Sequence, residues 1–156
     1  MNDAELDSAG VIAPPPLIFV GPLALGLLVQ RARPVSVLPR PLSLVLGWPL
    51  LAGGIALNLW FILTMRRAHT AIDPRRPVSR LVTSGPFQIS RNPSYTAFAL
   101  IYVGLASVRN ALWPLLLLPA AVLVMQRGVI EREERYLERR FGAEYNPYKA
   151  RVRRWL

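Results

Sequence analysis

The polar side chains best suited to chemistry lie in two short segments of a largely apolar chain. The first segment holds Arg91 and Tyr95, and the second holds Glu133 and Glu134, about 40 residues later. Arginine binds carboxylate or phosphate groups, and glutamates bind cations. Each residue also has a simpler explanation, since Arg91 at a membrane boundary can bind a lipid phosphate and acidic residues are stabilised at a helix N-terminus. Taken singly, none of them indicates a particular reaction.

His69 and Tyr95 also admit a purely structural interpretation. His69 is the only histidine of the chain, and a lone histidine near a membrane interface is more often structural than a catalytic base. A tyrosine such as Tyr95 at a helix end is typical of the aromatic belt of membrane proteins. The chain has no cysteine, which excludes a disulfide framework, a thiolate zinc site and a cysteine nucleophile. We therefore expect no metal centre.

The composition indicates a membrane protein. Of the 156 residues, 53% are hydrophobic and 18% are charged, and the mean hydropathy is +0.31, which is more apolar than a typical soluble domain of this length. Lysine and arginine number 19 against 9 acidic residues, so the net charge is +10. This balance favours an anionic partner, either phospholipid headgroups or nucleic acid. A disordered tail is excluded, and the length favours a single domain.

Four uncharged runs predict the membrane-spanning elements. Residues 10–30 and 41–65 are both long enough for a helix that crosses a bilayer, which needs about 20 apolar residues. Residues 92–108 and 110–126 form two shorter runs separated by Arg109, which predicts a tight helical hairpin. The fold class that we predict is an all-α integral membrane protein with four transmembrane helices plus C-terminal cytoplasmic interfacial helices.

The first run reads as a mature helix and not as a signal peptide, because the residues before it are acidic and not basic. Pro14, Pro15 and Pro16 mark its start, since proline suits the first turn of a helix and breaks its interior. We place its helical part at residues 17–31. Gly47, Gly53 and Gly54 can pack helices within one chain or between two, so the oligomeric state stays open.

The distribution of basic residues predicts the orientation in the membrane. Six lie in residues 66–91 and nine in residues 127–154, against three in residues 31–40 and one at Arg109. With four spans, the two large groups share one face with the N-terminus. The positive-inside rule then places both termini in the cytoplasm, and we expect a multi-pass protein of a bacterial cytoplasmic membrane. Nucleic acid is disfavoured as a partner, because the basic residues lie at predicted membrane edges and no reader motif is present.

The two cytoplasmic segments have features of ordered structure. In the first, residues 84–87 have a turn composition, and Asn92 followed by Pro93 predicts the N-cap and first position of the next helix. In the second, apolar residues recur with helical spacing from Ile130, which predicts a helix that ends at Gly142. Residues 145–155 alternate aromatic and basic side chains, as an amphipathic helix at a membrane surface does.

The combination of these motifs is far more specific than any of its parts. In chain order they are His69-Thr70 with Pro74, Gly85-Pro86-Phe87, Ser90-Arg91-Asn92-Pro93-Ser94-Tyr95, the hairpin, Glu133-Glu134 with Leu137, Phe141-Gly142, Tyr145, Tyr148, Val152 and Arg154-Trp155. From about residue 57 to the C-terminus, this pattern strongly resembles the membrane-embedded methyltransferases related to isoprenylcysteine carboxyl methyltransferase and the phospholipid N-methyltransferases. Asn92 stands where better-studied members carry histidine, so no histidine at that position acts on a substrate.

The resemblance implies an S-adenosylmethionine-dependent methyltransferase whose cofactor pocket lies on the cytoplasmic side. Its cofactor-binding residues would be His69, Arg91, Asn92, Pro93, Tyr95, Glu133 and Glu134, of which Arg91, Tyr95 and Glu134 would be catalytic. The charges are complementary, because the cofactor carries a carboxylate for an arginine and an ammonium and a sulfonium for glutamates. No Gly-x-Gly-x-x-Gly motif of a soluble dinucleotide fold is present.

The implied reaction is an in-line displacement, in which a lipophilic carboxylate or amine attacks the sulfonium methyl group. Positioning and exclusion of water carry most of the rate. The acceptor, a lipid or a lipophilic small molecule, would enter from the bilayer, and residues 145–155 would act as a lid or as a clamp on the membrane surface. The domain is then residues 1–156, with a tail (1–16), two spans (17–65), a cytoplasmic loop (66–92), the hairpin (93–126) and the cofactor-site segment (127–156).

Two other classes stay open at this point. A non-enzymatic membrane protein that recruits anionic lipid or a partner would need the basic residues but neither Tyr95 nor Glu134. A reductase of the sterol-reductase type shares an Arg-x-x-Pro-like segment, but such chains are much longer and have more spans. Binding of S-adenosylhomocysteine separates the first of these from a methyltransferase.

Overall fold

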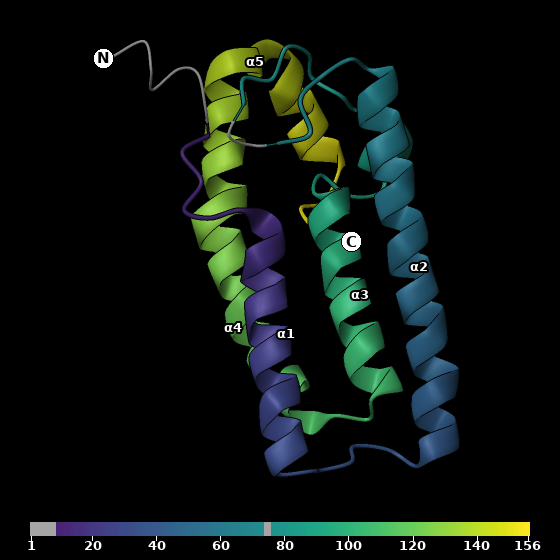
Figure 1. Ribbon diagram of the computed structural model, residues 1–156. Coiled ribbons are helices and arrows are strands. Elements are labelled where there is room, and N and C mark those ends of the chain that lie inside the picture. The colour runs from purple at the N-terminus through teal and green to yellow at the C-terminus, as the bar shows by residue number, and fades with distance from the viewer. Residues whose placement is uncertain (1–8, 74–75) are drawn as a thin grey trace.

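The computed structural model of the protein describes residues 9–73 and 76–156, and over these residues it contains helices and no strand (Figure 1). Pro74 and the first eight residues of the predicted tail lie outside the described residues. The helices are α1 (Pro15–Ala32), α2 (Arg40–Arg67), the 3-10 helix η2 (Gly85–Gln88), α3 (Pro93–Val108), α4 (Leu112–Met125), the π-helix η3 (Gln126–Ile130) and α5 (Glu131–Arg151). The predicted all-helical class is confirmed for this part of the chain.

Proline fixes where the first and third helices begin. Pro15 and Pro93 each stand at the first position of a helix, where the missing N–H is not needed and the fixed φ angle suits the helix. The predicted start of α1 at the proline run and the predicted start of α3 at Pro93 are thereby confirmed. The interior prolines Pro22, Pro49 and Pro119 lie within apolar helices, where they are more common than in soluble proteins.

The long helices run alongside one another as two pairs, with α2 packed mainly on α3 and α1 packed mainly on α4 (Figure 1). Glycines allow the close approach of α2 and α3. A methyl group added at Gly104 would lie 2.5 Å from the backbone nitrogen of Leu51, and one at Gly47 would lie 2.7 Å from the nitrogen of Val108. Gly54 packs on Ala97 and Ile101 of α3 in the same way, whereas Gly53 faces open space. Gly47 and Gly54 therefore serve packing within one chain.

Three helices in the described residues are long and apolar enough to cross a membrane. They are Pro15–Ala32, Arg40–Arg67 and the continuous helix Leu112–Arg151, while Pro93–Val108 is a shorter apolar helix. Large apolar side chains such as Val45, Leu59 and Leu116 are exposed on these helices, as expected of surfaces that face lipid.

The C-terminal region differs from the predicted arrangement. The helix predicted to end at Gly142 leaves helical geometry at Phe141 (φ −128°, ψ 28°) but resumes and continues to Arg151. Residues 152–155 are not helical, and Tyr145 and Tyr148 are buried within the protein. The alternation of aromatic and basic residues thus reflects a helix that packs on the protein, with Tyr148 Oη donating a hydrogen bond to the Phe87 carbonyl at 2.8 Å.

Candidate functional site

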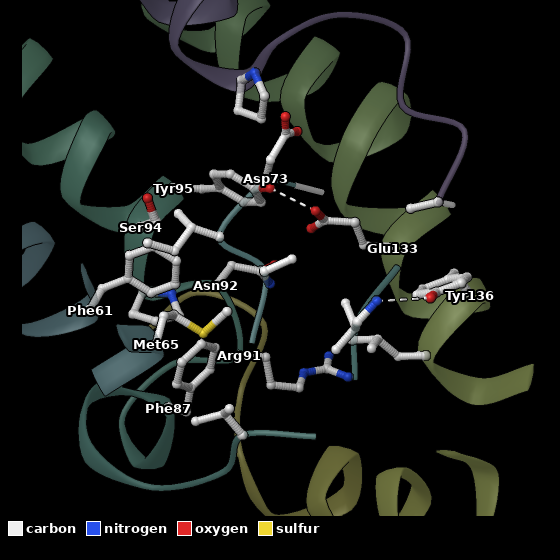
Figure 2. A pocket seen from close by; sticks show the side chains of 18 of the residues that line it. Phe61, Met65, Asp73, Phe87, Arg91, Asn92, Ser94, Tyr95, Glu133 and Tyr136 are labelled. Carbon is white, nitrogen blue, oxygen red and sulfur yellow. Dashed lines mark hydrogen bonds between the residues drawn. The ribbon is translucent and has the colours of Figure 1, made fainter. Parts of the chain in front are cut away.

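A cavity of about 470 Å³ lies at the end of the bundle where α1 begins, α2 ends and α3 begins (Figure 2). Apolar side chains from three helices line part of it, among them Phe61, Met65 and Phe98, and Pro14–Pro16 add to this wall. Polar side chains from α3, α5 and the loop before α3 line the rest. These are Asp73, Arg80, Arg91, Asn92, Ser94, Tyr95, Glu133, Glu134, Tyr136 and Tyr145. The cavity is therefore amphipathic, with a charged part and an apolar part.

The two segments that carry the predicted site meet in this cavity. Tyr95 lies on the first turn of α3, and its hydroxyl donates a hydrogen bond of 2.8 Å to Oε1 of Glu133 on α5 (Figure 2). Tyr95 is 9% exposed. This contact joins residues that are 38 positions apart in sequence.

The Glu134 carboxylate interacts with two arginines. Arg154 donates from Nε to Oε1 at 3.0 Å and from Nη2 to Oε2 at 2.7 Å, and Nη2 of Arg91 lies 3.2 Å from Oε1. A bidentate arginine–carboxylate pair is among the strongest charged contacts in proteins. With both oxygens engaged and a side chain only 7% exposed, Glu134 is oriented toward these arginines.

The Arg91 guanidinium is only partly satisfied by its neighbours: it pairs with Glu134 and also interacts with the Tyr145 hydroxyl. Its side chain is 10% exposed and lines the cavity, yet Nε and Nη1 have no hydrogen-bond partner among the described residues. A buried donor without a partner costs about 1–3 kcal/mol, and more when it is charged. Such a guanidinium in the wall of a cavity is suited to bind an anionic group such as a carboxylate.

Asn92 is the N-cap residue of α3 and Pro93 its first position, as predicted from the sequence, but the Asn92 side chain makes no hydrogen bond to the first turn of the helix. Its Nδ2 donates instead to the carbonyl of Arg154 at 2.8 Å. Pro93 beside it is buried and lines the cavity.

His69 lies apart from the other predicted site residues. It is exposed, has a positive φ of 49° in the turn after α2, and is not one of the residues that line the cavity. The structure therefore brings together Arg91, Asn92, Pro93, Tyr95 and the two glutamates, but not His69.

Burial alters the acid–base behaviour of Glu133, which lies beyond the apolar part of the long α4–α5 helix. Removal from water raises the pKa of Glu133 to about 7, and the neighbouring Glu134 carboxylate adds to the rise. The hydrogen bond from Tyr95 acts in the opposite direction. A carboxyl group with this pKa changes its charge near neutral pH, which is typical of functional sites.

Several lining residues were not predicted from the sequence. Asp73 and Arg80 come from the loop after α2. Tyr136 contacts the same loop, because its hydroxyl accepts a hydrogen bond of 3.1 Å from the Val78 N–H. No local signal marks these loop residues. The helical spacing of Tyr136 from Glu133, which places both on one side of α5, is the only clue that could have identified it.

The described residues form a helical bundle with apolar side chains on its outer surface and an amphipathic cavity at one end, as expected of a protein embedded in a membrane. The chain matches the phospholipid methyltransferase family over residues 42–144, and it belongs to that family. The predicted relationship to this group of membrane methyltransferases is confirmed.

The other comparisons add little about function. An uncharacterized protein of Haemophilus influenzae is 57% identical over 35 residues, which are 22% of this chain and 56% of that protein. The chain thus spans little more than half the length of that relative. No solved structure matches.

Proposed function

We propose that the protein is an S-adenosylmethionine-dependent methyltransferase that acts at the membrane interface on a lipophilic acceptor, an amine or a carboxylate. Membership of the phospholipid methyltransferase family supports a membrane methyltransferase. The observation that carries the finer proposal is Arg91, which lines the cavity and whose buried Nε and Nη1 have no hydrogen-bond partner among the described residues.

The charged part of the cavity fits the amino-acid portion of this cofactor. In the proposal, Nε and Nη1 of Arg91 bind its carboxylate, and the ionised form of Glu133 stabilises its positive charges. Tyr95 holds Glu133 through the hydrogen bond to Oε1. Asn92 and Pro93 form the adjoining wall. We leave His69 out of the site, because it is exposed and away from the cavity.

The apolar part of the cavity fits the acceptor. Phe61, Met65 and Phe98 lie on helices whose outer surfaces are apolar, so an acyl or other lipophilic chain can reach the cavity from the bilayer. When bound, the cofactor supplies an electrophilic methyl group on its sulfonium. The residues of the chain align the nucleophile with that group and exclude water, which together supply most of the rate enhancement.

The proposed topology follows from the position of the site. We infer four spans, with α3 as the short one, both termini in the cytoplasm and the cavity at the cytoplasmic surface. The polar cofactor then enters from the cytoplasm, and residues 1–156 act as one domain. The charged part of the cavity is formed by helix α5 and by the loop that precedes α3. Both belong to the two segments that hold most of the basic residues, which the positive-inside rule places in the cytoplasm.

A methyl-transfer assay tests the proposal. Purified protein in lipid bilayers is supplied with cofactor labelled in its methyl group, and with total membrane lipid, lipophilic amines or lipophilic acids in separate reactions. We expect label to appear in one lipophilic product class, and the Arg91→Met variant to lose most of this activity. Absence of transfer to every class, together with unimpaired lipid binding, would favour a non-enzymatic lipid-binding protein.

A further inference from the structure

The C-terminal tail returns to the site and is fixed there by backbone contacts. The Arg91 N–H donates to the carbonyl of Arg153 at 2.9 Å. The carbonyl of Arg154 accepts from Asn92 Nδ2 at 2.8 Å and from Ser90 Oγ at 3.3 Å. These hydrogen bonds use main-chain oxygens of the tail, so they persist when a tail side chain is truncated.

The side chain of Arg154 has a separate task. It binds Glu134 through both carboxylate oxygens, at 3.0 and 2.7 Å, while Arg91 reaches Glu134 with Nη2 alone, at 3.2 Å. Side-chain exposures of 32% for Arg154 and 7% for Glu134 show that the pair extends from the surface into the site. Glu134 thus lies between an outer and an inner arginine.

The geometry at Glu134 explains why Arg91 keeps free donors. A carboxylate and an arginine frequently form a bidentate pair. If Arg154 did not occupy both oxygens of Glu134, Arg91 could form the bidentate pair in its place, and Glu134 would then engage Nε or Nη1 of Arg91. The outer arginine therefore keeps the inner one available for a ligand.

We propose that Arg154 is a positioning residue of this site, which acts through Glu134 to hold the Arg91 guanidinium ready for the carboxylate of the cofactor. This inference rests on the proposed function. In this proposal Glu134 orients the Arg91 guanidinium, and Glu133 is the glutamate that faces the ligand. It also gives the C-terminal tail a task other than that of a lid or a membrane clamp.

Isothermal titration with S-adenosylhomocysteine on the full-length protein in detergent tests the inference. We expect Arg154→Ala to raise the Kd about tenfold, the scale of one well-formed charged contact. Arg153→Ala is the matched control, since it removes the same charge from an exposed neighbour and retains the carbonyl that Arg91 uses. Its Kd should stay within about twofold. The Kd of Arg154→Lys should lie between those of the wild type and Arg154→Ala, because a lysine ammonium cannot form a bidentate pair with both carboxylate oxygens.

A second ligand separates positioning from general disruption of the fold. Methylthioadenosine lacks the amino-acid portion, so its affinity should be the same in the wild type and in Arg154→Ala, within about twofold. Equal weakening of both ligands, or an unchanged Kd for S-adenosylhomocysteine in Arg154→Ala, would overturn the positioning role and leave the proposed function standing. A wild-type protein that binds neither ligand would overturn both.

Discussion

The two ends of the helical bundle satisfy their polar groups in opposite ways. At the end formed by residues 33–40 and 107–113, here called the Asn110 end, both polar side-chain atoms of the buried Asn110 have hydrogen-bond partners. Its Oδ1 accepts from the backbone N–H groups of Val37 and Leu38, each at 3.1 Å, and its Nδ2 donates to the Leu38 carbonyl at 2.7 Å. At the other end, Arg91 retains two buried donors without a partner among the described residues.

At the Asn110 end, hydrogen bonds hold together the two connections between helices. Ser43 donates to the Ser107 carbonyl at 2.6 Å, and Trp113 donates to the Arg33 carbonyl at 2.7 Å, so side chains complete the hydrogen bonding of both connections. Near this end, on α1, the buried side-chain oxygen Oε1 of Gln30 has no hydrogen-bond partner among the described residues, but it belongs to a neutral amide. Buried donors of a charged group that lack partners cost more than a neutral amide oxygen that lacks one. The Arg91 donors beside the cavity therefore distinguish this end of the bundle from the Asn110 end.

The largest expected effect is a loss of methyl transfer on substitution of Arg91, at the end of the bundle that holds the cavity. Arg91→Met should reduce methyl transfer by about 100-fold, because the donors for the ligand are lost. Its unfolding temperature should not fall, since the substitution removes a buried charge with two unpartnered donors while Glu134 keeps its pair with Arg154. Thermal unfolding in detergent and the labelled assay measure the two quantities. A clear loss of stability would mean that Arg91 is structural.

The reverse pattern is expected at the Asn110 end. Asn110→Gly keeps the positive φ of 50° accessible but removes three hydrogen bonds, so the free energy of unfolding should fall by about 2 kcal/mol. Methyl transfer at a temperature where the variant is folded should remain at the wild-type level. A fall in activity without a fall in stability would contradict the division between the two ends.

Removing the hydroxyl group from each of two tyrosines on α3 gives a matched pair of substitutions with smaller expected effects. Tyr95→Phe removes the hydroxyl that holds Glu133 and should lower activity about tenfold. Tyr102→Phe removes a hydroxyl that donates to the Pro114 carbonyl at 2.7 Å, and should cost about 1 kcal/mol of stability without loss of activity. The same two assays compare them. If both variants lost activity equally, the hydrogen bond to Glu133 would have no special role.

The smallest effect concerns the pH dependence of stability. The pKa of Glu133 is about 7 in the folded protein, against an ordinary value of 4.5, so folding takes up a proton between these pH values. The contribution of Glu133 to stability is therefore greatest below pH 4.5 and is lost as the pH rises toward 7. Unfolding temperatures between pH 5 and 8 should fall less steeply in Glu133→Gln than in the wild type. Identical slopes would show that Glu133 titrates normally.

The helices were largely predictable because apolar runs and prolines act locally. Residues 41–65 predict α2, which spans Arg40–Arg67, and residues 17–31 predict α1, which spans Pro15–Ala32. The continuity of α4 with α5 through the π-helix was not predictable. There the Gly128 carbonyl accepts from the Ile12 N–H at 3.3 Å, a contact that depends on the folded position of the N-terminal segment.

The site was predictable as a set of residues but not as a network. The motif placed Arg91, Tyr95 and the two glutamates together, and the structure joins Tyr95 to Glu133. The different partners of the two glutamates could not be predicted, because Arg154 reaches Glu134 only when the tail folds back. Burial of Tyr145 was missed for a similar reason, since an amphipathic pattern does not distinguish a protein surface from a lipid surface.

Photolabelling tests the central claim most directly. Irradiation of the wild-type protein with radiolabelled S-adenosylmethionine, followed by digestion and mass spectrometry, identifies the segments in contact with the cofactor. We predict label in peptides that contain residues 90–95 and 131–136, with excess S-adenosylhomocysteine preventing both. Competed label confined to other peptides, or no competed label at all, would contradict the claim that these two segments enclose one cofactor.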